Sequence, residues 1–286
     1  MLTDTHAHLD FPDFGEDLPG VLSRAAEAGV HRIVTIGTTL DGSQRTIGLA
    51  SNHEMIWATV GVHPSSADEA PLDVLTPLRA LASHRRVVAI GECGLDYHRL
   101  PSRKVHESAV ATAAFGNETT AAVEASILDA TVKEKQAAIF QQQLDLAVEL
   151  GLPVVIHERD AWDDTLAILQ PYTGKVRAVF HCFGKAPEHA EKVLAMGHLI
   201  SFTGIVTFKN AGALKETVAA VPASRYMVET DCPFLAPVPF RGKRCEPAHV
   251  RHTAEHIATL RGTTLSAVAA ETEATAEEFF RFGSER

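Results

Sequence analysis

The chain has 286 residues, of which 45% are hydrophobic and 22% are charged, and this composition excludes disorder, collagen and a coiled coil as its main state. Lys and Arg number 26, Asp and Glu number 36, and the net charge is −10. That charge argues against a basic protein that coats nucleic acid, although it is compatible with an enzyme that holds nucleic acid locally through metals and a few cations.

Continuously apolar runs rich in Val and Ile alternate with helical stretches along the chain, as expected for parallel strands that are covered on both faces. The predicted strands are residues 2–7, 32–37, 57–62, 87–92, 153–158, 176–181, 198–203 and 226–231. The predicted helices are residues 18–29, 72–83, 134–150, 160–171, 185–197, 247–261 and 264–281.

Eight strands that alternate with helices predict an α/β fold, and we expect a (β/α)8 TIM barrel that forms a single domain over residues 1–286. An open, doubly wound sheet is the alternative, but no GxGxxG motif follows the first strand. The segment at about 99–133 is longer than a connection after strand four should be. We interpret it as a helical insertion that forms a flap over the active-site face, with a solvated loop as the alternative.

The cysteines and the first residues indicate a cytoplasmic protein. The four cysteines form no CxxC pair, which fits a reducing compartment. The start, MLTDTHAHLD, has neither the basic nor the apolar region of a signal peptide. No uncharged apolar run approaches the ~20 residues of a membrane span.

Residue types that bind metals stand at the carboxyl ends of five predicted strands, and these ends form the active-site face of a barrel. His6 and His8 are two residues apart on the first strand, so their side chains point to the same side. The others are Glu92 in AIGE, His157 after PVVI, His181 after AVF and Asp231 in VETD. Each has an ordinary explanation alone, as a surface residue or a satisfied core residue, but a buried carboxylate without a partner is costly.

Together these six residues form a mixed nitrogen and oxygen ligand set, which suits Zn, Mn or Mg better than a thiolate site does. Six ligands exceed what one catalytic zinc needs, but they can hold two cations if one carboxylate bridges them. Cys93, Cys182 and Cys232 each follow a ligand directly. Strand alternation therefore predicts that their thiols turn away from the cations as small buried hydrophobes.

Motifs around these residues follow one another over most of the chain. They are DTHAHLD at 4–10, GVHP at 61–64, GECGLDYH at 91–98, QLDLAVELGLPVVIHERDA at 143–161, FHCF at 180–183, SFTGIVTFKNA at 201–211 and ETDCPFLAPVPFRGKRCEP at 229–247. In this order they resemble the TatD family of metal-dependent deoxyribonucleases, within the amidohydrolase-like barrels. Cys245 stands where the family usually has Asn, so a role for that side chain is in doubt.

The resemblance implies two divalent cations, Mg, Mn or Zn. His6, His8 and Asp231 would hold the first, His157 and His181 the second, and Glu92 would bridge them. Asp231 and Glu92 are the expected catalytic residues, because Asp231 would orient a hydroxide activated by the two metals and accept its proton. His63, in GVHP, matches a family histidine near the substrate phosphate. The other expected substrate-binding residues are the cations Arg159, Lys209, Arg241 and Lys243.

The function that the resemblance implies is hydrolysis of phosphodiester bonds in DNA, as a 3′-5′ exonuclease on single strands, with RNA as a further substrate. The alternative is another metal-dependent hydrolase on the same barrel, such as a D-aminoacyl-tRNA deacylase or a phosphoesterase. A metal-stabilised binding protein without catalysis is a third hypothesis, against which the intact ligand set argues. We expect nucleic acid, single-stranded DNA in particular, as the partner, and neither a membrane nor an obligate protein partner.

Overall fold

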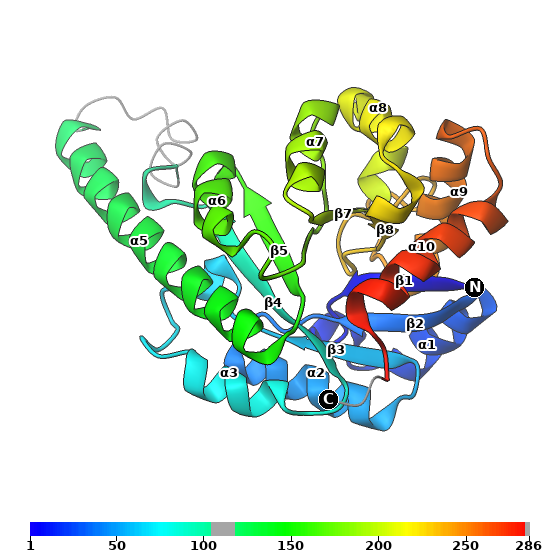
Figure 1. Cartoon of the computed structure of the whole chain (residues 1–286), viewed down its shortest axis with the longest axis horizontal. Coiled ribbons are helices and arrows are strands. Elements are labelled where there is room, and N and C mark those ends of the chain that lie inside the picture. The colour runs from blue at the N-terminus through cyan, green and yellow to red at the C-terminus, as the bar shows by residue number, and fades with distance from the viewer. Residues whose placement is uncertain (104–117, 284–286) are drawn as a thin grey trace.

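The computed structural model describes residues 1–103 and 118–283, with side chains described outside 104–123. Strands and helices alternate along the chain (Figure 1). The strands are β1 (Leu2–Ala7), β2 (Val30–Thr35), β3 (Ile56–Val60), β4 (Val87–Asp96), β5 (Val154–Arg159), β6 (Ala178–Phe180), β7 (Leu199–Phe202) and β8 (Tyr226–Val228). The helices are α1 (Leu18–Glu27), α2 (Leu40–Asn52), α3 (Leu75–Ala82), α5 (Glu118–Leu150), α6 (Trp162–Leu169), α7 (Pro187–Ala195), α8 (Gly212–Ala220), α9 (Val250–Leu260) and α10 (Leu265–Phe280).

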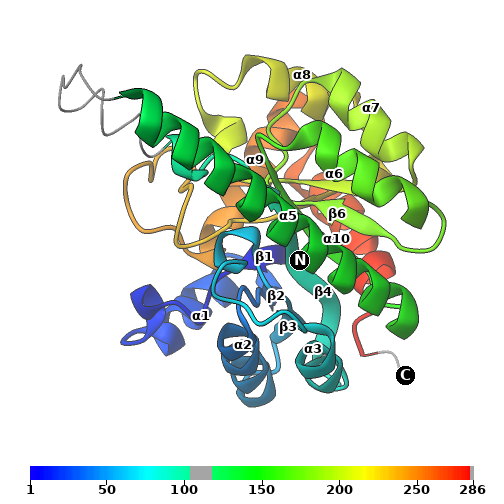
Figure 2. The ribbon, with the colours of Figure 1, turned by 90° about the vertical axis from the view of Figure 1, so that its left-hand side faces the viewer.

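The strands form one parallel sheet in the order β1 to β8, and the helices lie outside it (Figure 2). The sheet closes on itself just beyond β8, where Ala7 pairs with Cys232. The His8 amide donates to the Cys232 carbonyl at 2.8 Å, and the Asp231 amide donates to the His6 carbonyl at 2.9 Å. The predicted (β/α)8 barrel is confirmed, and the open sheet is excluded.

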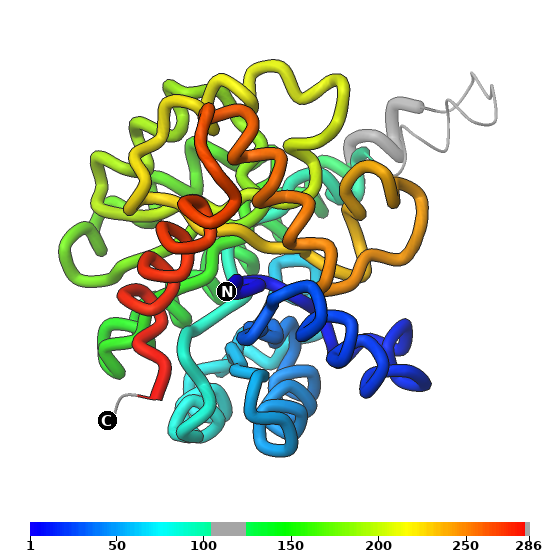
Figure 3. Tube along the Cα trace, turned by 90° about the vertical axis from the view of Figure 1, so that its right-hand side faces the viewer, coloured from blue at the N-terminus to red at the C-terminus, as the bar shows by residue number. Residues whose placement is uncertain are grey.

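Alternate strand residues point into the barrel, where they form an inner apolar cluster. Val155, Val179 and Met227 belong to this cluster, together with Phe279 and Phe280 of α10. Figure 3 shows α10 running past the start of β1, so this helix covers the amino end of the barrel. Strand side chains alternate with period two. Two residues beyond Val155, Val179 and Met227 come the polar residues His157, His181 and Glu229 at the carboxyl end.

Glycines allow β4 to lie unusually close to its neighbours at the carboxyl end. A Cβ on Gly61 would lie 2.5 Å from the carbonyl carbon of Gly91. Gly91 and Gly94 have φ of +130° and +138°, which favour glycine, and a Cβ on Gly94 would overlap the carbonyl oxygen of His157. The missing Cβ atoms therefore allow β4 to pack closely against β5 on either side of Glu92.

Two helices were not predicted from the sequence. Helix α2 contains Gly42 and Gly48, which lower helix propensity, but Thr39 caps it by accepting a hydrogen bond from the Gly42 amide at 2.9 Å. Helix α8 begins directly at Gly212 without a side-chain cap. Both helices lie outside the barrel, so tertiary packing rather than local propensity stabilises them.

The insertion after strand four is helical over its described part. Helix α5 has 33 residues, about 50 Å at the rise of an α-helix, and begins 16 residues before the predicted start at residue 134. Its amino-terminal end projects beyond the barrel (Figure 2). Residues 104–117, the rest of the predicted flap, lie outside the described residues. Within the described part of the chain, no helix combines the length and apolar character needed to cross a membrane.

Replacing Gly94 by Ala is expected to lower the free energy of unfolding by about 3 kcal/mol, because the positive φ and the overlap with the His157 carbonyl both oppose a Cβ. The matched control is Gly174→Ala, where φ is +76° but a Cβ would meet nothing within 4 Å. This control should lose only about 1 kcal/mol, the backbone cost alone. Urea unfolding at equilibrium measures both values. Equal losses would show that β4 and β5 tolerate separation at Gly94.

Candidate metal centre

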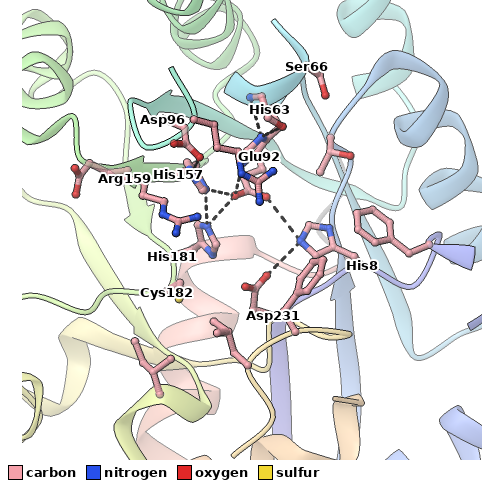
Figure 4. A pocket seen from close by; sticks show the side chains of 18 residues that line it. His8, His63, Ser66, Glu92, Asp96, His157, Arg159, His181, Cys182 and Asp231 are labelled. Atoms are coloured by element: carbon pink, nitrogen blue, oxygen red, sulfur yellow. Dashed lines mark hydrogen bonds and ion pairs between the residues drawn. The ribbon is translucent and has the colours of Figure 1, made fainter. Parts of the chain in front are cut away.

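A cavity of about 660 Å³ opens at the carboxyl ends of the strands. Its volume lies within the usual range of small-ligand sites. Figure 4 shows side chains from strands around the barrel pointing into it. The residues that line it are His8, Phe11, Thr38, His63, Ser65, Ser66, Glu92, Asp96, Arg99, His157, Glu158, Arg159, His181, Cys182, Ile205, Asp231, Phe234 and Leu235.

The carboxylate of Glu92 lies at the centre of the cluster, with its side chain 3% exposed. Its Oε1 atom lies 2.8 Å from His157 Nδ1 and 2.8 Å from His181 Nε2. Its Oε2 atom faces the other side of the barrel, 3.4 Å from His6 Nε2 and 3.9 Å from His8 Nε2. The two carboxylate oxygens therefore face different histidines.

Asp231 lies against the first pair of histidines. Its Oδ1 atom is 3.3 Å from His8 Nε2 and 3.6 Å from His6 Nε2. The backbone of Asp231 is left-handed, with φ of 57°, and its amide bonds to the His6 carbonyl. Barrel closure thus places this carboxylate beside the His-x-His pair at the end of β1, although Asp231 and His6 are 225 positions apart along the chain.

The chemistry of these side chains fits bound cations. Potential ligand atoms lie within 4.8 Å of one another in three overlapping groups: His6, Glu92 and His181; His6, His8 and Asp231; and His63, Glu92 and His157. Both ring nitrogens of His6, and Nδ1 of His8, are buried without a hydrogen-bond partner in the described residues. A buried polar atom without a partner is costly. A cation would take up the lone pair of His6 Nε2, which faces Glu92 and Asp231, and the imidazole and carboxylate ligands suit borderline divalent ions.

The histidines control the ionisation of the carboxylates. Burial alone would raise the pKa of Glu92, but the nearby histidines, His181 first, outweigh it and hold the pKa well below the usual range. Burial opposes the charge on His181 too, yet Glu92 and Glu229 raise its pKa well above the usual value. Burial likewise opposes charge on Asp231, and the hydrogen bond from His8 leads the effects that lower its pKa. Both carboxylates are therefore ionised in this cluster.

Two further buried carboxylates hold the histidines, and the sequence analysis did not assign either. Glu229 accepts hydrogen bonds from the Cys182 amide and the Ser201 hydroxyl, both at 2.6 Å, and lies 3.5 Å from His181 Nδ1. Asp96 lies 3.2 Å from His157 Nε2. Glu229 precedes Asp231 by two residues, so strand alternation was a signal for it. Asp96 carried no such signal, because its role depends on the close approach of β4 and β5.

The predicted substrate-binding residues divide into two groups. His63 and Arg159 line the cavity, and His63 Nε2 lies 3.5 Å from Glu92 Oε1. Lys209, Arg241 and Lys243 are not among the lining residues, and the Arg241 guanidinium lies 4.4 Å from the ring centroid of Phe208. Arg99, which the sequence analysis did not single out, does line the cavity.

The cysteine prediction holds for two positions and is wrong for the third. Cys93 and Cys232 are buried in the outer core. Cys182 lines the cavity, because β6 ends at Phe180 and the φ of Cys182 is 48°, so strand alternation no longer sets its direction. In the described part of the insertion, Arg99 lines the cavity and none of residues 100–103 and 124–133 does, so the flap stays a prediction.

An eight-stranded parallel barrel with histidines and carboxylates gathered at the carboxyl ends of its strands defines the class: an α/β barrel with a candidate metal centre on its active-site face. The chain matches the family described as TatD related DNase over residues 3–281. It therefore belongs to this family, as the resemblance in the sequence predicts.

Similar proteins support the assignment over nearly the full length. The chain is 38% identical to "Uncharacterized metal-dependent hydrolase YabD" of Bacillus subtilis, over 98% of this chain and 99% of that protein. It is 34% identical to "3′-5′ ssDNA/RNA exonuclease TatD" of Klebsiella pneumoniae, over 97% of both chains. The crystal structure of YjjV, a TatD homologue from Escherichia coli, superposes with a TM-score of 0.82 at 26% identity and covers 98% of each chain.

Replacing Glu229 by Gln is expected to weaken metal binding about 10- to 100-fold while the barrel stays folded. The amide keeps the size of the side chain but removes the negative charge near His181 and cannot accept every bond that the carboxylate accepts. Calorimetric titration of the metal-stripped protein with Mn²⁺ measures the change in metal affinity. Glu216→Gln on α8, an exposed site, is the matched control. An unchanged affinity in a folded Glu229→Gln variant would exclude a positioning role.

Proposed function

We propose that the protein is a metal-dependent nuclease that removes nucleotides from the 3′ end of single-stranded DNA or RNA. The observation that carries this proposal is the position of Glu92, whose Oε1 atom faces His157 and His181 and whose Oε2 atom faces His6 and His8. A carboxylate so placed can serve two cations, and paired cations suit phosphodiester hydrolysis. The name of the Klebsiella pneumoniae relative supports the polarity and the single-stranded substrate.

In this proposal His6, His8 and Asp231 would hold one cation, His157 and His181 would hold the other, and Glu92 would serve both. The imidazoles favour Zn, and the carboxylates suit Mn and Mg. When bound, the cations supply Lewis acidity and neutralise charge on the phosphoryl oxygens.

The residues of the chain orient the reactants. The Asp231 carboxylate, ionised beside His8 and open to the cavity, orients the attacking water and accepts its proton. The water oxygen bonds to phosphorus, the bond from phosphorus to the 3′ oxygen of the preceding nucleotide breaks, and that oxygen takes a proton from solvent. From the cavity wall, His63 contacts the phosphate that is cleaved, and Arg159 holds a neighbouring phosphate of the strand. The terminal nucleotide leaves with its 5′ phosphate.

The compartment that suits this activity is the cytoplasm. All four cysteines are free, as expected for a protein that works under reducing conditions.

Metal add-back tests the proposal directly. The metal-stripped protein is incubated with Mg²⁺, Mn²⁺ or Zn²⁺ in turn, and with single-stranded DNA, duplex DNA or RNA labelled at the 5′ end. A ladder that shortens from the 3′ end of single strands with at least one metal supports the proposal. Intact nucleic acid with every metal, together with release of amino acid from D-aminoacyl-tRNA, would favour the deacylase instead.

Replacing Glu92 by Ala is expected to abolish hydrolysis and to lower bound metal to about one ion or none, because one carboxylate serves both cations. Metal content is measured by mass spectrometry after dialysis, and turnover with the labelled strand. Glu188→Ala, whose side chain is 68% exposed on α7, should retain both. Two metal ions and normal turnover in Glu92→Ala would contradict the bridging role.

A further inference from the structure

The cavity has one aromatic wall. Phe234 lines the cavity with 51% of its surface exposed. The other Phe, Tyr and Trp side chains in the described part of the chain are buried or only partly exposed. The Phe234 ring meets Phe11, which also lines the cavity, edge to face at 6.1 Å. Because the Phe234 ring is half exposed, packing in the core does not account for its position. Its exposed face is available to another ring.

This aromatic wall adjoins the His8 and Asp231 side of the cluster. The centroid of the Phe11 ring lies 4.7 Å from that of His8, and the two rings are stacked. The Phe234 ring lies 6.2 Å from the His8 ring. A planar group bound on these phenylalanines is therefore next to the proposed ligands of the first cation.

The opposite wall is cationic. Arg99 follows the end of β4, and Arg159 is the last residue of β5. Both side chains line the cavity and are exposed. Neither guanidinium forms an ion pair with a described residue, whereas nearby Arg103 bonds to Asp160 at 2.6 Å. Figure 4 shows Arg159 beside His157 and His181, across Glu92 from His8. The chain has a net charge of −10. Two arginine side chains beside one cavity, without an ion-pair partner among the described residues, therefore favour an anionic ligand.

We propose that Phe11 and Phe234 form a stacking subsite for the 3′-terminal base, and that Arg99 and Arg159 hold the backbone phosphate of the preceding nucleotides. The inference rests on the proposed nuclease function and names the part of the strand that each wall binds. Stacking on phenylalanine makes no hydrogen bond to the base, so the subsite accepts every base. The base must leave its stack and its pair to reach the rings, which makes an unpaired end the substrate.

A purely structural role for these rings is the competing explanation, because Phe11 stacks on His8 and could orient it. The two explanations differ in what they affect. If the rings form a stacking subsite, removing one changes the discrimination of the terminal base and leaves metal affinity unchanged. If they only orient His8, removing one lowers metal affinity and leaves the discrimination of the base unchanged.

The test uses two single strands that differ only at the 3′ end, one with a normal terminal nucleotide and one with an abasic terminal sugar. The wild-type protein should lose about tenfold in kcat/KM on the abasic strand. Phe234→Ala should lose about the same factor on the normal strand and little more on the abasic strand. Val238→Ala, in the same loop and 50% exposed but absent from the cavity lining, should behave as the wild type. Phe234→Leu, which keeps an apolar side chain without a ring, should resemble Phe234→Ala.

Several outcomes overturn the proposal. A Phe234→Ala variant that still discriminates against the abasic strand, or one that loses Mn²⁺ affinity with normal discrimination, would exclude the stacking subsite. If the wild-type protein cleaves neither strand with any metal, the proposed nuclease function fails separately. Fluorescence polarisation of the two strands then still tests the subsite, since equal affinities of the wild type for both would exclude it.

The cationic wall has its own readout. A dinucleotide carries only the scissile phosphate, whereas a long strand also carries the phosphates that Arg99 and Arg159 would hold. Arg99→Ala and Arg159→Ala should therefore lower kcat/KM more on the long strand than on the dinucleotide, and weaken its salt dependence. Arg85→Ala, exposed at the amino end of β4, is the control. Equal losses on both substrates would exclude a contact beyond the scissile phosphate.

Discussion

A carboxylate buried at the mouth of the barrel, that of Glu92, sets the main constraint on this structure. Taking a charge out of water is expensive unless partners compensate it. The compensation comes from histidines on both sides, with His157 and His181 at 2.8 Å from one oxygen and His6 at 3.4 Å from the other. None of these histidines lies on the same strand as Glu92. The site therefore forms only when the barrel is closed.

The surroundings of Glu92 follow from this constraint. Gly91 and Gly94 on either side of it take positive φ, and their missing Cβ atoms let β4 pack against β5. Asp96 lies 3.2 Å from the far nitrogen of His157, and Glu229 lies 3.5 Å from that of His181, an arrangement that orients histidines for metal binding. The charged cluster lies on the strands and just beyond their carboxyl ends, while loop residues Phe11, Phe234 and Arg99, with Arg159 at the end of β5, supply the aromatic and cationic walls of the cavity.

The sequence predicted the parts of the site that depend on local pattern. Strands alternate and end at the same face in a parallel barrel, so polar residues after apolar runs, such as His157 and His181, indicated one cluster before the fold was known. The pattern could not show Asp96 or Arg99, because their positions depend on how β4 leaves the barrel and approaches β5. It also misplaced the thiol of Cys182, since a positive φ interrupts the alternation there. Helix α2 was not predicted because its glycines lower the helix propensity of the segment, whereas the Thr39 cap and packing on the barrel stabilise the helix.

The account depends most on two cations that share Glu92, and anomalous scattering from crystals grown with Mn²⁺ tests this most directly. We expect two anomalous peaks per chain, one among His6, His8 and Asp231 and the other between His157 and His181, with one oxygen of Glu92 facing each peak. A single peak bound by His63, Glu92 and His157, or peaks away from Glu92, would contradict the account.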